Sequence, residues 1–259
     1  MENKLQKLKR FNLIMGGFHL IQGIAMLFLA TTVIQKIAEF QPVITQNFLE
    51  FNPTTQSLEL ASKELFTLPF GVLVASFLLI SAVAHGVIVL RAEKYFEGLK
   101  KGINVYRWYE YALSSSVMIV LISTLFGIYD IASLSLIFIV NAAMNLFGLD
   151  MELINAGSTK EKVDWRPFIF GSVAGLAPWV AILLYMFGNG NFDQVPWFVW
   201  AIVGTYFVAF NTFPVNMVLQ YLRVGKWKDY LYGERTYIVL SLAAKSILAW
   251  LVLFGAMQP

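Results

Sequence analysis

Residues 234–250, ERTYIVLSLAAKSILAW, begin the last long apolar run of the chain, which continues through LVLFGAM. Lys245 stands near the middle of this run, eleven residues after Glu234 and twelve before Met257. On a helix it lies more than about 13 Å from either end, where its amine reaches water only by long snorkelling. A cation at the centre of a bilayer costs roughly 2.5–3.5 kcal/mol on insertion scales. Such a lysine therefore needs a partner or a chemical task.

The composition of the whole chain is that of a membrane protein. Of 259 residues, 58% are hydrophobic and 14% are charged, whereas soluble domains carry about 25% charged residues. There is no cysteine, and the two histidines are too few for a histidine metal cage, so we predict no metal site. The net charge of +3 comes from loops and therefore bears on membrane orientation rather than on nucleic-acid binding.

Seven apolar segments have close to the twenty residues that a helix needs to cross a bilayer. They predict an all-α membrane protein, a seven-transmembrane helix bundle in which residues 1–259 form a single domain. The predicted spans are residues 11–33, 68–90, 103–126, 131–153, 167–187, 195–222 and 236–257.

The long outer loop between the first two spans, residues 34–66, has a strand-like pattern. VITQNFLEF alternates polar and apolar residues, the turn signal Asn52-Pro53 follows it, and QSLEL comes next. This order predicts a short β-hairpin, with an irregular loop as the alternative.

Lysines and arginines are distributed unequally between the two ends of the predicted spans. Fifteen lie at the end that holds the N-terminus, and only Lys36 and Lys63 lie at the opposite end. Because positively charged loops stay inside the cell, we expect a multi-pass protein of the cell membrane with a cytoplasmic N-terminus and an extracellular C-terminus. The basic loops suit anchoring to anionic membrane lipid or docking of a cytoplasmic signalling partner.

The predicted orientation directs the search for a partner of Lys245. Helical side chains lean toward the N-terminus of their helix, so the amine should point toward Ser241 and the cytoplasmic half. The only carboxylate well inside a predicted span is Glu110, roughly 9 Å deep in the third span. We interpret Glu110 as the buried counter-charge; the alternative is a surface pair with Arg107 near the headgroups.

Other polar and aromatic residues fall at positions that suit a site. His19 and His85 lie at matching depth in the first two spans, with Ser81 one turn from His85. They favour a shared polar pocket, although a lone histidine is more often a core residue. Asn141 and Asn145 share a face that would join helices. The sixth span carries aromatics beside Pro214, whose kink could make room for a planar ligand. Gly171-x-x-x-Gly175 is a weak dimer signal.

A buried lysine can form a Schiff base with a carbonyl ligand, and one buried carboxylate would stabilise its protonated form. Seven helices, a lysine in the middle of the last and an acid in the third suggest a retinal-binding protein. RWYEYALSSS (residues 107–116), SLAAKSILAW (residues 241–250), the two histidines, the long outer loop and the inside N-terminus together resemble the heliorhodopsins. The resemblance covers essentially the whole chain.

The resemblance implies all-trans retinal bound to Lys245 with Glu110 as sole counterion. It implies a light-sensing, signalling protein rather than an enzyme, with a slow photocycle, no ion pumping and a dimeric state. It also implies an inner polar cavity formed by His19, His85 and Ser81. Further residues would line or tune the retinal pocket, and these are Ser241, Tyr111, Ser115, Met118, Asn141, Met144 and Phe210.

Two alternative functions remain open at the level of sequence. A light-driven proton transporter is favoured by the polar inner cluster. Against it, light-driven pumps resemble one another in having two acids eleven residues apart in the third helix, and here that position is Leu121. The other alternative is a non-photoactive seven-helix membrane protein that binds a soluble ligand and uses Lys245 and Glu110 as a structural ion pair.

Overall fold

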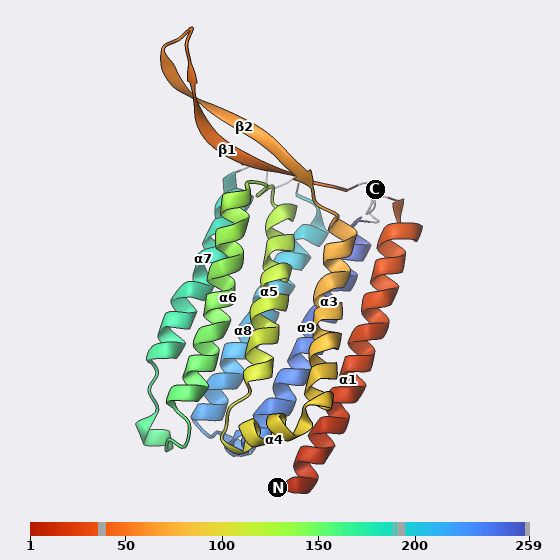
Figure 1. Ribbon diagram of the computed structural model, residues 1–259, viewed down its shortest axis with the longest axis vertical. Helices are drawn as coiled ribbons and strands as arrows, with labels where there is room; N and C mark the ends of the chain where they lie inside the picture. The colour runs from red at the N-terminus through yellow and green to blue at the C-terminus, as the bar shows by residue number, and fades with distance from the viewer. Residues whose placement is uncertain (36–39, 189, 191–194, 257–259) are drawn as a thin grey trace.

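The computed structural model describes residues 1–35, 40–188, 190 and 195–256. Seven helices within these ranges are long and apolar enough to cross a membrane, which confirms the predicted seven-helix bundle (Figure 1). They are α1 (Glu2–Phe28), which continues as the π-helical turn η1 (Leu29–Val33), α3 (Phe70–Leu90), α5 (Val105–Leu125), α6 (Ile131–Ile154), α7 (Arg166–Gly188), α8 (Trp197–Tyr221) and α9 (Tyr230–Ala256).

Two helices begin several residues earlier than the hydropathy predicted. Both extensions lie at the end of the bundle that holds the N-terminus. The first starts at Glu2 because Leu5 and Leu8 are buried and extend its apolar face below the expected span. The last starts at Tyr230, and its expected end at Met257 lies outside the described residues. Lys36, used in the charge comparison, also lies outside them.

The segment after α3, expected only as a connection, forms a short helix, α4 (Ala92–Lys100). Tyr95, Phe96 and Leu99 form its buried face and pack against residues of α1, including Leu5. Figure 1 shows α4 lying across the end of the bundle near the N-terminus. The sequence signal was present, because apolar residues recur at helical spacing between the charged ones.

The long outer loop contains the predicted hairpin. Strands β1 (Val43–Asn52) and β2 (Ser57–Thr67) pair antiparallel and project away from the bundle (Figure 1). In the turn, Asn52 Oδ1 accepts a hydrogen bond from the Thr54 amide at 2.9 Å. The base of the hairpin rests on the turn between α5 and α6, where the Thr45 amide donates to the Tyr129 carbonyl at 3.0 Å.

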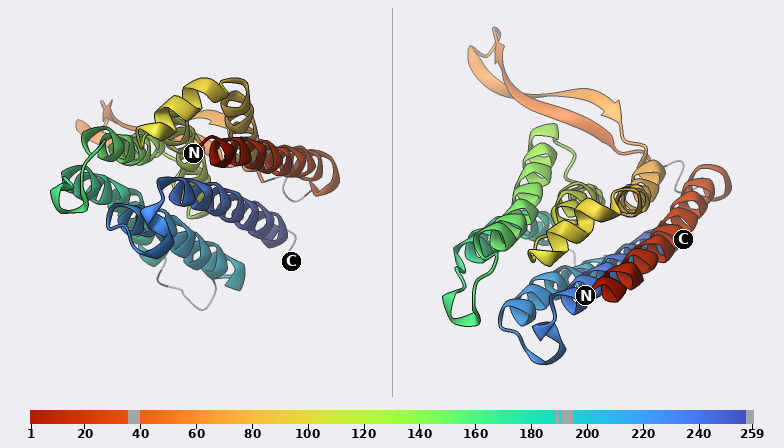
Figure 2. Two further views of the ribbon diagram at one scale, coloured as in Figure 1. Left: turned by 90° about the horizontal axis from the view of Figure 1, so that it is seen from below. Right: turned by 60° about the horizontal axis from the view of Figure 1, so that its bottom comes forward.

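The helices are arranged so that α1, α3 and α9 meet around the Lys245 region. Figure 2 shows α1 beside α3 on one side and α9 on the other. Next in the bundle, α3 contacts α5, α5 contacts α6, α6 contacts α7, and α8 contacts α9. A side chain in the half of α9 that begins at Tyr230 can therefore meet side chains from both α3 and α5.

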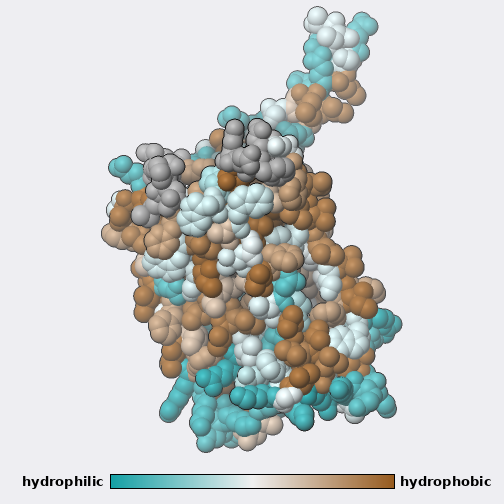
Figure 3. All heavy atoms as spheres, turned by 180° about the vertical axis from the view of Figure 1, so that it is seen from behind, coloured by the Kyte–Doolittle hydropathy of each residue, from teal (hydrophilic) through white to brown (hydrophobic). Residues whose placement is uncertain are grey.

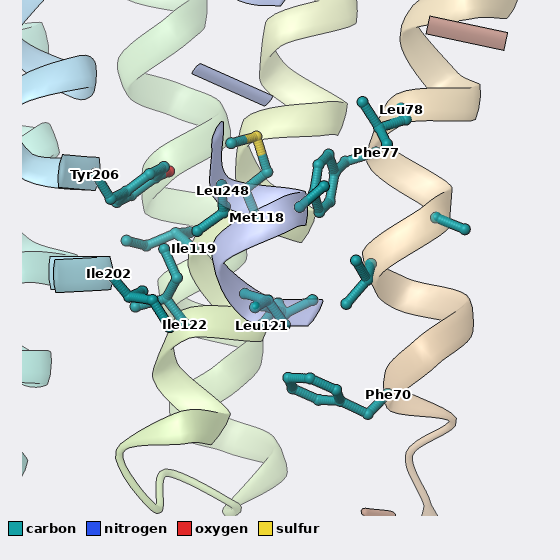
Figure 4. Packing of buried hydrophobic residues seen from close by; sticks show 14 of the residues in the cluster. Phe70, Phe77, Leu78, Met118, Ile119, Leu121, Ile122, Ile202, Tyr206 and Leu248 are labelled. Atoms are coloured by element: carbon teal, nitrogen blue, oxygen red, sulfur yellow. The ribbon is translucent and has the colours of Figure 1, made fainter. Parts of the chain in front are cut away.

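The half of the bundle nearest the hairpin is filled by apolar side chains. Phe77, Leu78, Ile119, Leu121 and Ile122 are each completely buried there. In Figure 4, Phe77 and Leu78 extend from α3 on one side, and Ile119 and Ile122 of α5 lie beside Ile202 and Tyr206 of α8 on the other. This packing leaves the polar site on the N-terminal side of the apolar core.

The two glycines of the fifth predicted span lie inside the protein. A Cβ added at Gly171 would lie 3.1 Å from Phe147 Cβ, and one added at Gly175 would lie 2.7 Å from Met144 Sδ. Both contacts are with α6 of the same chain. The interpretation of Gly171-x-x-x-Gly175 as a dimer signal was therefore wrong, because the motif serves close packing of α6 against α7.

Candidate functional site

Lys245 forms a buried ion pair with Glu110. Its Nζ lies 2.5 Å from Glu110 Oε1, and the two side chains are 4% and 9% exposed. The amine also donates to Ser81 Oγ at 2.6 Å and to Ser241 Oγ at 3.0 Å. Helices α9, α5 and α3 thus contribute to one polar cluster. Ser241 is one turn before the lysine, where the lean of helical side chains directs the amine.

The surroundings of the amine compensate its charge within the protein. Ser81 Oγ donates to Glu110 Oε1 at 2.6 Å, so the serine links both members of the ion pair. The Tyr111 ring lies beneath the amine, with its centroid 5.4 Å from Nζ. Removing one partner of such a buried charge pair is strongly destabilising, because the remaining charge is left uncompensated. The site can therefore hold a cation at the lysine nitrogen without bulk water.

A cavity of about 290 Å³ begins at Lys245 and extends between α5, α6, α7 and α8. This volume is near the lower end of the range for small-molecule sites, roughly 300–1,000 Å³. The walls are mainly apolar and aromatic. Of the residues predicted from sequence, those that line it are Tyr111, Ser115, Met118, Met144, Phe210, Ser241 and Lys245.

Asn141 is the predicted pocket residue that the structure does not bring to the cavity. It is completely buried between α5 and α6, and its Nδ2 donates to Ser115 Oγ at 2.8 Å. Asn145, one turn along the same face, lines the cavity and donates to the same oxygen at 3.0 Å. The amide pair therefore joins two helices and fixes a serine that faces the cavity.

Aromatic residues that the sequence analysis did not single out enclose the cavity farther from the lysine. The Trp179 ring lies 5.5 Å from that of Tyr206 and 5.9 Å from that of Phe210. The predicted aromatics beside Pro214 also line this space, as does Pro214 itself. The available signal for Trp179 was its position directly after Pro178 within an apolar span. Together these rings form a box suited to a planar, conjugated ligand.

A second, smaller cavity of about 30 Å³ lies on the side of the ion pair nearer the end of the bundle that holds the N-terminus. Ser81, His85 and Glu110 line it, and its volume exceeds the roughly 10–15 Å³ that one water needs. His19, expected in the same cavity, does not line it. Its ring instead stacks on that of His85, with the centroids 5.5 Å apart.

Arg107 departs most clearly from the sequence prediction. It is 5% exposed and forms ion pairs with Glu152 and Glu234, both also buried, rather than a surface pair with Glu110. Trp108 Nε1 donates to Glu152 Oε2 at 2.7 Å, and Asn104 Nδ2 donates to Glu234 Oε2 at 2.7 Å. Glu152 falls at the end of its predicted span and Glu234 just before the start of the last one, and the length of an apolar segment does not reveal how deeply a helix end is buried.

The comparisons with known proteins agree with this geometry. The family model described as heliorhodopsin matches residues 8–257 of the chain. A comparison with curated proteins finds no match. The matched range includes all the helices that line the two cavities.

Proposed function

The chain belongs to the heliorhodopsin family of retinal-binding rhodopsins, and we propose that it is a light sensor in which Lys245 carries all-trans retinal as a protonated Schiff base. Glu110 serves as the counterion. The photocycle is slow and moves no ion across the membrane. The observation that carries the proposal is the position of the Lys245 amine, which is paired with a buried acid at the end of an aromatic cavity.

The residues present fit retinal by shape and by chemistry. The cavity has a volume of about 290 Å³, its walls are mainly apolar, and Lys245, which carries a primary amine, is part of its lining. Retinal supplies a carbonyl carbon, to which the amine nitrogen bonds as the carbonyl oxygen leaves as water, and a conjugated chain that isomerises when it absorbs light. The oxygen atoms of Glu110, Ser81 and Ser241 surround the nitrogen and stabilise positive charge on it.

The remaining residues of the site orient the ligand and exclude water. Trp179, Tyr206 and Phe210 hold the far end between ring faces. The Asn141–Ser115 hydrogen bond keeps a polar group against one side of the cavity. Because protein interiors are close-packed, small differences in these walls select one ligand shape.

The apolar half of the bundle supports sensing over pumping. Ile119, Leu121 and Ile122 are completely buried between the site and the hairpin end. Light-driven pumps resemble one another in having a second acid at the position of Leu121, and in this chain that position holds a packed leucine. The polar cavity that Ser81, His85 and Glu110 line lies on the opposite side of the site, which favours internal transfer of a released proton and its return.

The surface supports the proposed orientation in a cell membrane. Figure 3 shows hydrophilic side chains gathered at the end opposite the hairpin and a largely hydrophobic surface above them. We assign the hydrophilic end to the cytoplasm, because it carries the excess of lysine and arginine. The hairpin and the C-terminus are then extracellular. Membrane lipid surrounds the chain, and we infer a homodimer and a cytoplasmic signalling partner from the family resemblance.

An absorption spectrum after addition of all-trans retinal tests the assignment. The unmodified protein should gain a band in the visible region, and Lys245→Ala should remain colourless at equal yield. Lys63→Ala, on the exposed face of the hairpin, is the matched control and should colour normally. A coloured Lys245→Ala protein would overturn the covalent linkage. Failure of the unmodified protein to colour would favour a binder of a soluble ligand.

A further inference from the structure

We propose that Asn12 is a positioning residue: it holds His85 in the tautomer that carries its proton on Nδ1, and so leaves Nε2 free to accept a proton. The light-driven part of this inference rests on the proposed function, whereas the tautomer itself does not.

The orientation of the Asn12 amide is determined by its neighbours. Asn12 is completely buried on α1, and its Nδ2 lies 3.0 Å from the Leu8 carbonyl oxygen and 3.3 Å from Tyr95 Oη. A backbone carbonyl can only accept a hydrogen bond, so the nitrogen of the amide must face Leu8. The oxygen Oδ1 must then face the other way, toward His85.

This orientation decides which ring nitrogen of His85 carries the proton. His85 Nδ1 lies 2.8 Å from Asn12 Oδ1, an atom that only accepts. Nδ1 must therefore be the donor. In a neutral imidazole the other nitrogen is then unprotonated and keeps its lone pair. Within the part of the chain that the structure describes, no hydrogen bond reaches Nε2.

His85 lines the smaller cavity. Ser81 and Glu110, which touch the Lys245 amine, line the same space. His19 stacks on the His85 ring, and Lys245 is reached from this space through Ser81 and Glu110. The other titratable residues that line the space are Tyr106, Arg107, Tyr111 and Glu234. A proton that leaves the lysine nitrogen can therefore bond to Nε2, and Nδ1 keeps its own proton and its bond to Asn12.

A close approach of two helices holds this arrangement. Gly16 lies one turn after Asn12 on the same face of α1, and a Cβ added there would lie 2.7 Å from His85 Cβ. A larger residue at Gly16 would push α3 away and lengthen the Asn12–His85 hydrogen bond. A Cβ added at the next residue, Gly17, would meet nothing within 4 Å, so Gly17→Ala provides a matched control.

A buried ion pair toward the end of the bundle that we assign to the cytoplasm limits how far the proton can move. Arg107 and Glu234 line the same cavity as a buried ion pair, and they lie nearer than Glu110 and Lys245 to the ends of α5 and α9 that we assign to the cytoplasm. A proton stored on His85 would therefore return to the site rather than pass to the cytoplasm. This storage fits a slow sensor better than a pump.

The tautomer can be measured in the dark by nitrogen NMR of protein labelled with ¹⁵N-histidine, with His19→Phe used to assign the His85 signals. We expect protonated Nδ1 and unprotonated Nε2 in the unmodified protein. Tyr95→Phe should keep this pattern because the Leu8 carbonyl still orients the amide, and Asn12→Asp should keep it because an acceptor remains. Asn12→Leu should lose it. Protonation at Nε2 in the unmodified protein, or an unchanged tautomer in Asn12→Leu, would overturn the proposal.

A second measurement tests the consequence in the retinal-loaded protein. Flash-induced absorbance changes should show proton transfer from the lysine nitrogen slowed by at least about a hundredfold in Asn12→Leu, the lower end of what a positioned proton acceptor contributes. Gly16→Ala should slow it in the same direction, and Gly17→Ala should not. Equal rates in the two glycine variants would contradict the role of the close helix approach. A protein with the expected tautomer but no light response would leave the Asn12 assignment standing and refute the proposed function.

Discussion

Lys245 Nζ and Glu110 Oε1 lie 2.5 Å apart, although 135 residues separate them in the chain. Each group would be costly to bury alone, and each is tolerated because the other is present. Their contact also places a single negative charge beside the nitrogen that the proposed chromophore uses. The first prediction follows from this arrangement.

Glu110→Gln should shift the visible band of the retinal-loaded protein to longer wavelength. The carboxylate holds positive charge near the lysine nitrogen in the ground state, and light absorption moves that charge along the conjugated chain. Removing the carboxylate therefore lowers the excitation energy. Absorption spectroscopy measures the shift, and Glu50→Gln on the exposed hairpin is the control. An unchanged band in Glu110→Gln would assign the counterion to another group.

Arg107→Gln should destabilise the bundle by about 3–5 kcal/mol, because it leaves two buried carboxylates without their cation. Those carboxylates belong to Glu152 of α6 and Glu234 of α9. Thermal unfolding followed by circular dichroism measures the loss. The exposed Arg10→Gln is the control and should change the midpoint little. Similar midpoints for the two variants would show that the cluster contributes little to stability.

Docking of the hairpin on the bundle should weaken at low pH through Asp130. This carboxylate accepts hydrogen bonds from the Ser133 amide and hydroxyl and from the Asn47 amide, and these bonds hold its pKa below the usual value. Because the folded pKa is the lower one, the stabilisation is present above the unfolded pKa of about 3.9 and is lost as the pH falls through the folded value.

Hydrogen exchange at the Asn47 and Ser133 amides measures this effect. Both should exchange faster as acid protonates Asp130, after correction for the intrinsic dependence of exchange on pH. Asp130→Ala should show the fast exchange at neutral pH and lose about 0.5–2 kcal/mol from the helix cap. Protection that is equal in the variant and the unmodified protein would mean that other contacts hold the hairpin.

Illumination should produce no sustained proton transport. Cells that contain the retinal-loaded protein, in weakly buffered medium, should show no light-dependent pH change that a protonophore abolishes. The physical reason is that the packed layer between the site and the hairpin, to which Ile119, Leu121 and Ile122 belong, is apolar and completely buried at these positions. A steady, protonophore-sensitive change would instead support the light-driven transporter.

Several features could be predicted from the sequence because they depend on local patterns. The length of the apolar segments predicted seven helices, and the alternation around Asn52-Pro53 predicted the hairpin. A lysine near the middle of an apolar run required a partner whatever the fold, and one acid deep in another span was the natural candidate. The heliorhodopsin resemblance rested on these same residues, and the family match agrees with it.

Other features depended on how the helices rotate and how deeply their ends are buried. Arg107 looked like a residue near a membrane surface, but packing of α5, α6 and α9 encloses it with two acids. His19 and Asn141 had suitable depth, but helix rotation turns them away from the cavities they were expected to line. Gly171 and Gly175 contact a neighbouring helix of the same chain.

The sequence by itself therefore determined the number of spans, the hairpin, and the need to neutralise Lys245. Tertiary structure alone decided which polar groups face the cavities, and it made Asn12 a neighbour of His85. The reason is that hydrophobic length and alternation are properties of consecutive residues. Contacts between side chains instead depend on helix rotation and close packing, which residues distant in the chain establish together.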